Sequence, residues 1–218
     1  MIEAATFITE LLAKNQAAID RLVGGYLAAI EKEGFGIADV LKVELKIVIE
    51  AAEVAALWTS DSEDLDFKLA MASQCGDRAR HYHLIRGRLE ALGVDLTGTD
   101  PRQGGYSKLF AFQRSLQTTE ERACAGGITA RTLSIARAGV LADWCDLKED
   151  AETARLYRDA LRPDDQRHYE AGRNALLKVA IGEESQARAR RAAYRVIELV
   201  GELQEPNSLR KILARTKK

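Results

Sequence analysis

The sequence has few of the residues that mark cross-linked or exported proteins. Its three cysteines, Cys75, Cys124 and Cys145, are widely spaced and form no C-x-x-C pair, which predicts neither a disulfide framework nor a zinc knuckle. No apolar run approaches the roughly 20 residues that span a bilayer. The first residues, MIEAATFITELLAKNQ, carry acids where a signal peptide has a basic end. We therefore expect a cytoplasmic protein with no membrane segment.

A net charge is also lacking, because 32 Lys and Arg residues oppose 33 Asp and Glu residues. Without a field of one sign, the chain is not expected to bind nucleic acid or a membrane surface. The exception is the segment after Pro206, NSLRKILARTKK, which is basic and contains no acid. We expect residues 206–218 to form a solvated, frayed tail. Its basic residues are Arg210, Lys211, Arg215, Lys217 and Lys218.

The composition that remains is typical of a globular helical protein. Hydrophobic residues make up 46% of the 218 residues, charged residues make up 30%, and there are only three prolines. Frequent Ala, Leu, Arg and Glu favour an all-α fold, and the length suits one domain over residues 1–205. The spacing of apolar residues predicts a first helix that ends before Gly34-Phe35-Gly36. Its apolar stripe needs a cover, which makes a homodimer through this helix plausible.

Two helical hairpins follow, joined by a long connection. We expect helices over residues 37–59 and from about 64 to 92, with Gly93 as the C-cap, and then over residues 107–145, from 150 past 168, and over 185–201. A bend is expected at Gly126-Gly127. The connection GVDLTGTDPRQGGY cannot be a helix, but extended it reaches roughly 45 Å, the length of a helical bundle.

The second predicted helix carries two different sets of charges. Lys42, Lys46, Glu50 and Glu53 are spaced to form one stripe, which predicts a solvent-facing side. Glu44 has only apolar helical neighbours at three and four positions, so its carboxylate lies on the apolar side. A buried carboxylate without a partner costs several kcal/mol, and Glu44 therefore needs a cation, a proton or a metal.

All three histidines lie in two similar segments, CGDRARHYHLI and PDDQRHYEAG. Each segment has an acid, then a basic residue, then His-Tyr, at His81-Tyr82 and at His168-Tyr169. Asp165 lies three residues before His168, which puts both on one face of a helix, as in the metal centres of helical bundles. A second reading of Asp165 is that it belongs to the acidic first turn of a helix that begins near Pro163.

These features resemble the ferritin-like superfamily, whose four-helix bundles hold two metals with a Glu from each of two helices and a Glu-x-x-His from each of the other two. The layout agrees over about residues 37–181, with one helix added before and one after. Counting 17 residues each way from Asp61 puts Glu44 level with Arg78, and counting 18 from Leu147 puts Asp165 level with Thr129. The resemblance thus implies an all-α ferritin-like bundle with its site at this level.

Two of the six family ligands are missing. Arg78 stands where the first Glu-x-x-His has its Glu, and no acid occurs between Glu121 and Asp143, so that Thr129 takes the place of another carboxylate. The resemblance implies that the remaining ligands hold one iron or manganese, with Arg78, Thr129, Tyr82 and Tyr169 lining the site. Those ligands are Glu44, His81, Asp165 and His168.

Two functions follow from the resemblance and from the departures. The first is a metal-dependent oxidoreductase or oxygenase that acts on a small-molecule substrate at a reduced, mononuclear site. The second is a non-catalytic bundle that has lost its metals and serves as a partner subunit or a ligand-binding protein. In that case Arg78 pairs with Glu44 or Asp165 in a buried salt bridge.

Overall fold

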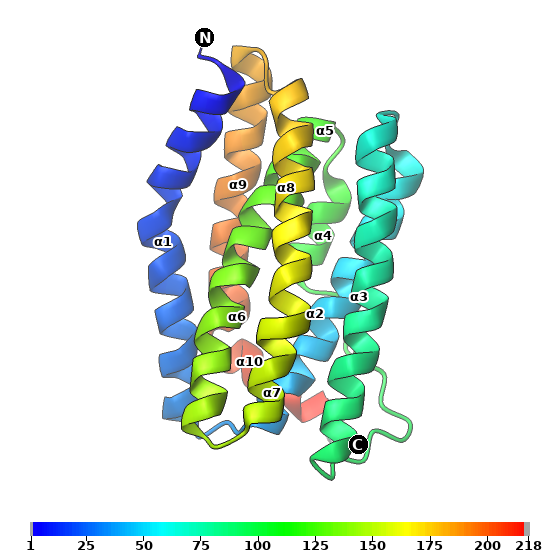
Figure 1. Cartoon of the computed structure of the whole chain (residues 1–218), viewed down its shortest axis with the longest axis vertical. Coiled ribbons are helices and arrows are strands. Elements are labelled where there is room, and N and C mark those ends of the chain that lie inside the picture. Colours follow the sequence, from blue (N-terminus) through cyan, green and yellow to red (C-terminus); the bar gives the residue numbers. More distant parts are fainter. Residues whose placement is uncertain (1, 216–218) are drawn as a thin grey trace.

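The computed structural model describes residues 2–215, and all regular elements among them are helices. This confirms the all-α prediction. The long helices lie roughly alongside one another, with α1 at one side of the bundle and α2 and α3 at the other (Figure 1). Their bounds are α1 Ala4–Glu33, α2 Ile37–Asp61, α3 Leu65–Ala91, α4 Lys108–Ser115, α5 Thr119–Arg122, α6 Ala130–Leu147, α7 Ala151–Arg155, α8 Arg162–Val179, α9 Glu183–Gln204 and α10 Pro206–Arg215.

Helix α1 ends at Gly34, whose φ of 68° is the left-handed conformation that glycine adopts without strain. Its apolar stripe, which includes Phe7, Leu11 and Ile19, is buried. The cover comes from the same chain, because α1 packs against α9, α6 and α8. The sequence argument for a homodimer through this stripe is therefore wrong, and a dimer remains only an untested prediction.

Helices α2 and α3 form the first hairpin. The turn between them ends at Asp64, whose side chain accepts a hydrogen bond from the backbone N–H of Phe67 and so caps α3. Helix α3 ends as predicted, with Gly93 just beyond it at a φ of 79°. The hairpin presents one face of α3 to α8.

The connection after α3 leads to α4, and the two together carry the chain from one end of the bundle towards the other, where α5 begins (Figure 1). The predicted helix over residues 107–145 is interrupted, because α4 covers Lys108–Ser115 and a break precedes α5. The connection also lies on part of the stripe that was expected to face solvent. Lys46 Nζ donates to the carbonyl of Gly105 at 2.7 Å, and Glu50 accepts from the backbone N–H of Ser107 at 2.9 Å. Lys46 and Glu50 are therefore buried.

Two of the helical segments contain π-helical turns. Segment η1, Ala123–Thr129, joins α5 to α6, and segment η2, Leu156–Leu161, joins α7 to α8. The bend expected at Gly126-Gly127 falls within η1, and η2 lies directly before Pro163. Because α7, η2 and α8 form one continuous helical segment, α8 does not begin freely at Pro163. Asp165 does lie in the acidic first turn of α8, as the alternative interpretation expected, but this turn continues the helical backbone of η2.

Close backbone contact fixes how α8 sits against η1. A Cβ atom added to Gly172 would lie 2.5 Å from Cα of Gly127, a distance that real side chains do not allow. A Cβ atom on Gly126 would likewise lie 2.4 Å from the Trp58 ring. Gly126 and Gly127 of η1 therefore set how closely α2 and α8 approach the segment that precedes Arg131.

The C-terminal segment forms α10, which packs on α9 and α2. Its Leu209, Ile212 and Leu213 are buried, so this part of the basic segment belongs to the core and is not a solvated tail. Lys217 and Lys218 lie outside the described residues. Across residues 2–215, no helix combines the length and the apolar character needed to cross a membrane.

Candidate functional site

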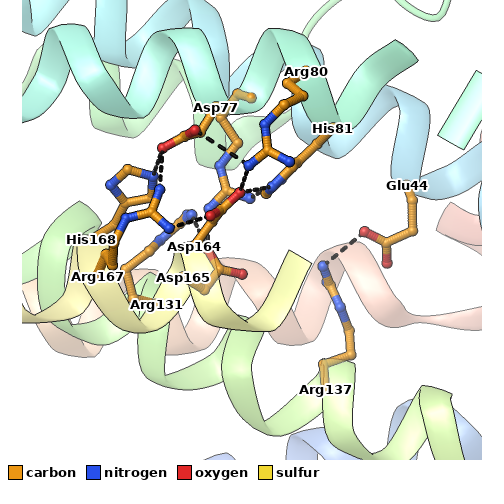
Figure 2. A network of polar contacts seen from close by, with 11 residues as sticks. Glu44, Asp77, Arg80, His81, Arg131, Arg137, Asp164, Asp165, Arg167 and His168 are labelled. Carbon is orange, nitrogen blue, oxygen red and sulfur yellow. Dashed lines mark hydrogen bonds and ion pairs between the residues drawn. The ribbon is translucent and has the colours of Figure 1, made fainter. Parts of the chain in front are cut away.

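Helices α3 and α8 run antiparallel and meet at two copies of the pattern Asp-x-x-Arg-His (Figure 1). One copy is residues 77–81 of α3 and the other is residues 164–168 of α8. Each aspartate contacts the arginine and the histidine of the other helix, as Figure 2 shows. The similarity of the two segments in the sequence thus reflects a reciprocal contact, and the acid that matches Asp77 is Asp164 rather than Asp165.

Asp164 is the more buried of the two aspartates. It accepts hydrogen bonds from Arg80 and Arg167, and His81 Nε2 lies 2.7 Å from its Oδ2. Although burial opposes the charged form, the hydrogen bonds from His81 and Arg167 lower the pKa of Asp164. Asp164 is therefore an ionised carboxylate held by three donors.

The position of Arg78 decides which nitrogen of His81 carries the proton. Arg78 Nη1 lies 3.2 Å from His81 Nδ1, and a guanidinium has only donors, so Nδ1 accepts. The proton then resides on Nε2 and is donated to Asp164. Burial first, and then the charge of Arg78, lower the pKa of His81, which is consistent with a neutral ring. Both ring nitrogens are engaged.

His168 occupies the equivalent place on α8. Its Nε2 lies 3.0 Å from Oδ2 of Asp77, but the contact lacks the angle of a hydrogen bond. Burial, and secondarily Arg78, lower the pKa of this ring as well. His168 is thus a buried and mainly neutral histidine, and Asp77 is also held by Arg167 at 2.9 Å.

Asp165 points away from the contact between α3 and α8 and is paired with two arginines. Arg78 donates to its Oδ1, and Arg131 Nη1 donates to the same oxygen at 2.8 Å. The side chains of Arg78 and Asp165 are 4% and 2% exposed. The predicted salt bridge from Arg78 to Asp165 is confirmed, and Arg131 is an additional partner.

Glu44 pairs with a different arginine from the one proposed. Arg137 Nη2 donates to Glu44 Oε2 at 3.1 Å, and the other carboxylate oxygen, Oε1, has no partner among the described residues. Burial outweighs the attraction of Arg137 and raises the pKa of Glu44. Burial also raises the pKa of the neighbouring Tyr157 far above its usual range, so its hydroxyl keeps its proton.

These groups line a small, partly open chamber of about 20 Å³ between α2, α3, α6, η2 and α8. That volume holds about one water-sized group. Three arginines and two carboxylates line it, together with the hydroxyl-bearing Ser134 and Tyr157. The arginines are Arg78, Arg131 and Arg137, and the carboxylates are Glu44 and Asp165. We call this space the arginine chamber.

The structure brings only part of the predicted site together. Glu44, Asp165 and Arg78 line the arginine chamber, whereas His81 and His168 lie in the contact between α3 and α8. Thr129 is buried but is not a lining residue of the chamber, and Tyr82 and Tyr169 are half-buried and pack against other parts of the core. The expected single layer of ligands is therefore divided between two neighbouring places.

In this arrangement the predicted ligands do not fit a metal ion. Oδ1 of Asp165 is directed at two guanidinium groups, both nitrogens of His81 have partners, and Glu44 pairs with Arg137. Among the described residues, no three His, Cys, Asp or Glu side chains are gathered as metal ligands would be. A cation placed beside Arg78 and Arg131 would also be repelled by them.

Sequence reasoning missed four residues of this region: Arg131, Arg137, Asp164 and Tyr157. Arg131 and Arg137 are six positions apart on α6, a spacing that does not by itself place two side chains on one helical face. For Asp164 a signal was present, since Asp-x-x-Arg-His recurs without a gap in both segments. Tyr157 lies in η2, whose wider turn changes the register that helical counting assumes.

Comparisons with known proteins add no assignment. The chain matches no family model, no curated protein and no solved structure. The resemblance to the ferritin-like superfamily thus remains a prediction.

Proposed function

We propose that this protein is a ferritin-like helical bundle that works without metals and binds a small anion in the arginine chamber. The proposal develops the second function expected from the sequence, a non-catalytic ligand-binding protein. It rests on one observation above all: two buried arginines and the half-buried Arg137 line a small cavity that has only two carboxylates in its lining. A small anion is the partner that such an excess of positive charge favours.

The charges of the wider network support this assignment. Arg80 and Arg167 are matched by Asp77 and Asp164 at the contact of α3 with α8. Around the chamber, Asp165 and Glu44 face Arg78, Arg131 and Arg137, which leaves one arginine more than the carboxylates offset. An uncompensated buried charge costs several kcal/mol, and a bound monovalent anion removes that cost.

The unpaired hydrogen-bonding groups at the chamber also favour an anion. Within the described residues, Arg78 Nε, Arg131 Nε and the Tyr157 hydroxyl are buried without hydrogen-bond partners. All three atoms can donate, so together they favour an acceptor. Among the described residues, Glu44 Oε1 is the one free acceptor there, so unpaired donors outnumber unpaired acceptors at the chamber.

The competing proposal is the metal-dependent oxidoreductase that the resemblance implies, with iron or manganese on Glu44, His81, Asp165 and His168. Two observations favour it. Both histidines are buried and mainly neutral, as metal binding requires, and π-helical turns such as η1 and η2 often occur at functional sites. It requires, however, that Arg78 and Arg131 release Asp165.

One thermal-unfolding experiment separates the two proposals. Sodium gluconate, whose anion is too large for the chamber, is replaced stepwise by sodium formate or sodium nitrate at constant ionic strength. A ligand that binds only the folded chain raises Tm with its concentration, so we expect Tm to rise with formate or nitrate and to stay constant with anaerobic Fe(II) or Mn(II). Bound metal is measured in parallel as atoms per chain.

The matched variants are Arg131→Met and Arg86→Met. Arg131 lines the chamber, whereas Arg86 is an exposed arginine of α3 that pairs with Glu90. We expect Arg131→Met to lose the rise in Tm and Arg86→Met to keep it. No response to either anion contradicts the proposal, and about one metal atom per chain with a raised Tm supports the oxidoreductase instead.

A further inference from the structure

We infer that the anion is the head group of a short aliphatic monocarboxylate, whose alkyl chain lies in a second cavity beside the arginine chamber. This inference rests on the anion-binding function proposed above and names the class of ligand. It depends on the position, the lining and the size of the second cavity.

The second cavity lies between α1, α2, α4, α6, α9 and α10 and has a volume of about 60 Å³. Apart from Tyr26, Gln204 and the residues that it shares with the chamber, its lining is apolar. The apolar residues that dominate it are Val43, Leu109, Leu133, Val200, Leu203 and Leu209. An apolar group placed there loses its contact with water, which is the main source of affinity for alkyl chains.

Four residues line both cavities, which therefore adjoin: Ile47, Arg131, Ser134 and Arg137. Two of these are arginines whose guanidinium groups contact carboxylates on the chamber side. A molecule that occupies both cavities therefore meets positive charge at one end and apolar side chains at the other. That polarity matches a carboxylate with an aliphatic chain and does not match an alkylamine.

The two volumes limit the size of the ligand. The chamber holds about one water-sized group, which leaves room for one oxygen of a planar carboxylate and too little for a bulky tetrahedral head group. The second cavity is about three times larger and holds a few carbon atoms. The charge excess of one arginine also favours a monovalent head group over a dianion such as hydrogen phosphate.

The test is a series of linear carboxylates from formate to octanoate, titrated into the intact protein by calorimetry. Each methylene that enters the apolar cavity contributes enough for about a fourfold lower Kd. We expect Kd to fall by about that factor per carbon over the first few carbons and then to rise once the chain exceeds the cavity. Alkylamines of equal length serve as the charge control and are expected not to bind.

A pair of variants ties the chain-length effect to the cavity. Ala130 lines the second cavity and does not line the chamber, so Ala130→Leu fills tail space only. We expect it to weaken the longer acids at least tenfold and to leave formate within about twofold. Ala111→Leu, on an exposed position of α4, is the control that leaves the whole series unchanged.

The outcomes separate this inference from the proposed function. Should formate and nitrate bind while Kd stays constant within twofold along the series, the alkyl site is refuted and the anion site stands. Should no carboxylate and no nitrate bind, both fail. The series on the parent protein is decisive even where Ala130→Leu does not fold.

Discussion

Arg131 and Asp165 form an ion pair of 2.8 Å in the interior of the bundle, with side chains that are only 8% and 2% exposed. Asp165 holds Arg78 by the same oxygen, so one carboxylate joins α3, α6 and α8. A buried carboxylate between two guanidinium groups is costly to disturb, because removing one partner leaves buried charge behind. This arrangement ties the stability of the bundle to its candidate site.

The first prediction concerns Asp165. Asp165→Asn keeps the volume but removes the charge that Arg78 and Arg131 share. We expect the free energy of unfolding, measured with urea, to fall by about 3–5 kcal/mol. Asp143→Asn removes a carboxylate that is 77% exposed and pairs with Arg158, and it should cost no more than about 1 kcal/mol. Equal losses in the two variants argue against the buried network.

Stability should also depend on pH through the buried histidines. Burial and Arg78 lower the pKa of both His81 and His168 in the folded chain, so the unfolded chain takes up protons first as the pH falls. The contribution of the two histidines to the free energy of unfolding is therefore expected to be constant above about pH 6.5 and to decrease below it. Urea titrations between pH 7.5 and 5 measure this slope.

The control for this slope is the third histidine. His83 is exposed on α3, so His83→Gln should leave the dependence on pH unchanged. His168→Gln removes one of the two buried rings and should reduce the slope. A parent protein whose stability does not change between pH 7.5 and 5 contradicts the assignment.

The close contact between Gly172 and Gly127 predicts that a Gly→Ala substitution has opposite effects on stability at two positions. Gly172→Ala puts a methyl group against the backbone of Gly127 and forces α8 away from η1, which should cost about 1–3 kcal/mol or more. Gly139→Ala, on α6 with no atom within 4 Å of the new Cβ, should stabilise the protein by up to about 1 kcal/mol. Thermal unfolding of both variants measures the difference, and a loss in both would refute the contact.

The connection that precedes α4 should loosen when its anchor on α2 is removed. Glu50 accepts hydrogen bonds from both the backbone N–H and the hydroxyl of Ser107, at 2.9 and 2.5 Å. We expect Glu50→Ala to speed tryptic cleavage after the exposed Arg102, as followed by mass spectrometry. Glu63→Ala, at an exposed position, should cleave at the parent rate. Unchanged cleavage of Glu50→Ala would show that the anchor contributes little.

Much of the fold could be predicted because helix formation is local. Apolar spacing and the glycines at 34 and 93 placed the ends of α1 and α3 correctly. The long connection was expected to run the length of the bundle, but it reaches only the middle of α2, at Lys46 and Glu50, and α4 continues from there. The burial of Lys46 and Glu50 was not predicted. Their spacing on α2 is that of a solvent-facing side, and the residues that cover them belong to the connection, which is distant in the sequence.

The candidate site could be predicted only in part for a related reason. Arg78 was expected to pair with Glu44 or Asp165, since counting from the turns places them at one level, and its partner is Asp165. Arg137 was not paired with Glu44, and Arg131 was not placed beside Asp165. Both arginines lie on α6, which follows η1, and a π-helical turn shifts the register on which such counting depends.

Anomalous diffraction from crystals soaked in sodium bromide tests the central claim most directly, because bromide is a small monovalent anion whose position can be measured. We expect a bromide ion in the arginine chamber, in contact with the guanidinium groups of Arg78 and Arg131. A chamber without bromide, together with iron or manganese bound between Asp165 and His168 in metal-soaked crystals, would contradict the account.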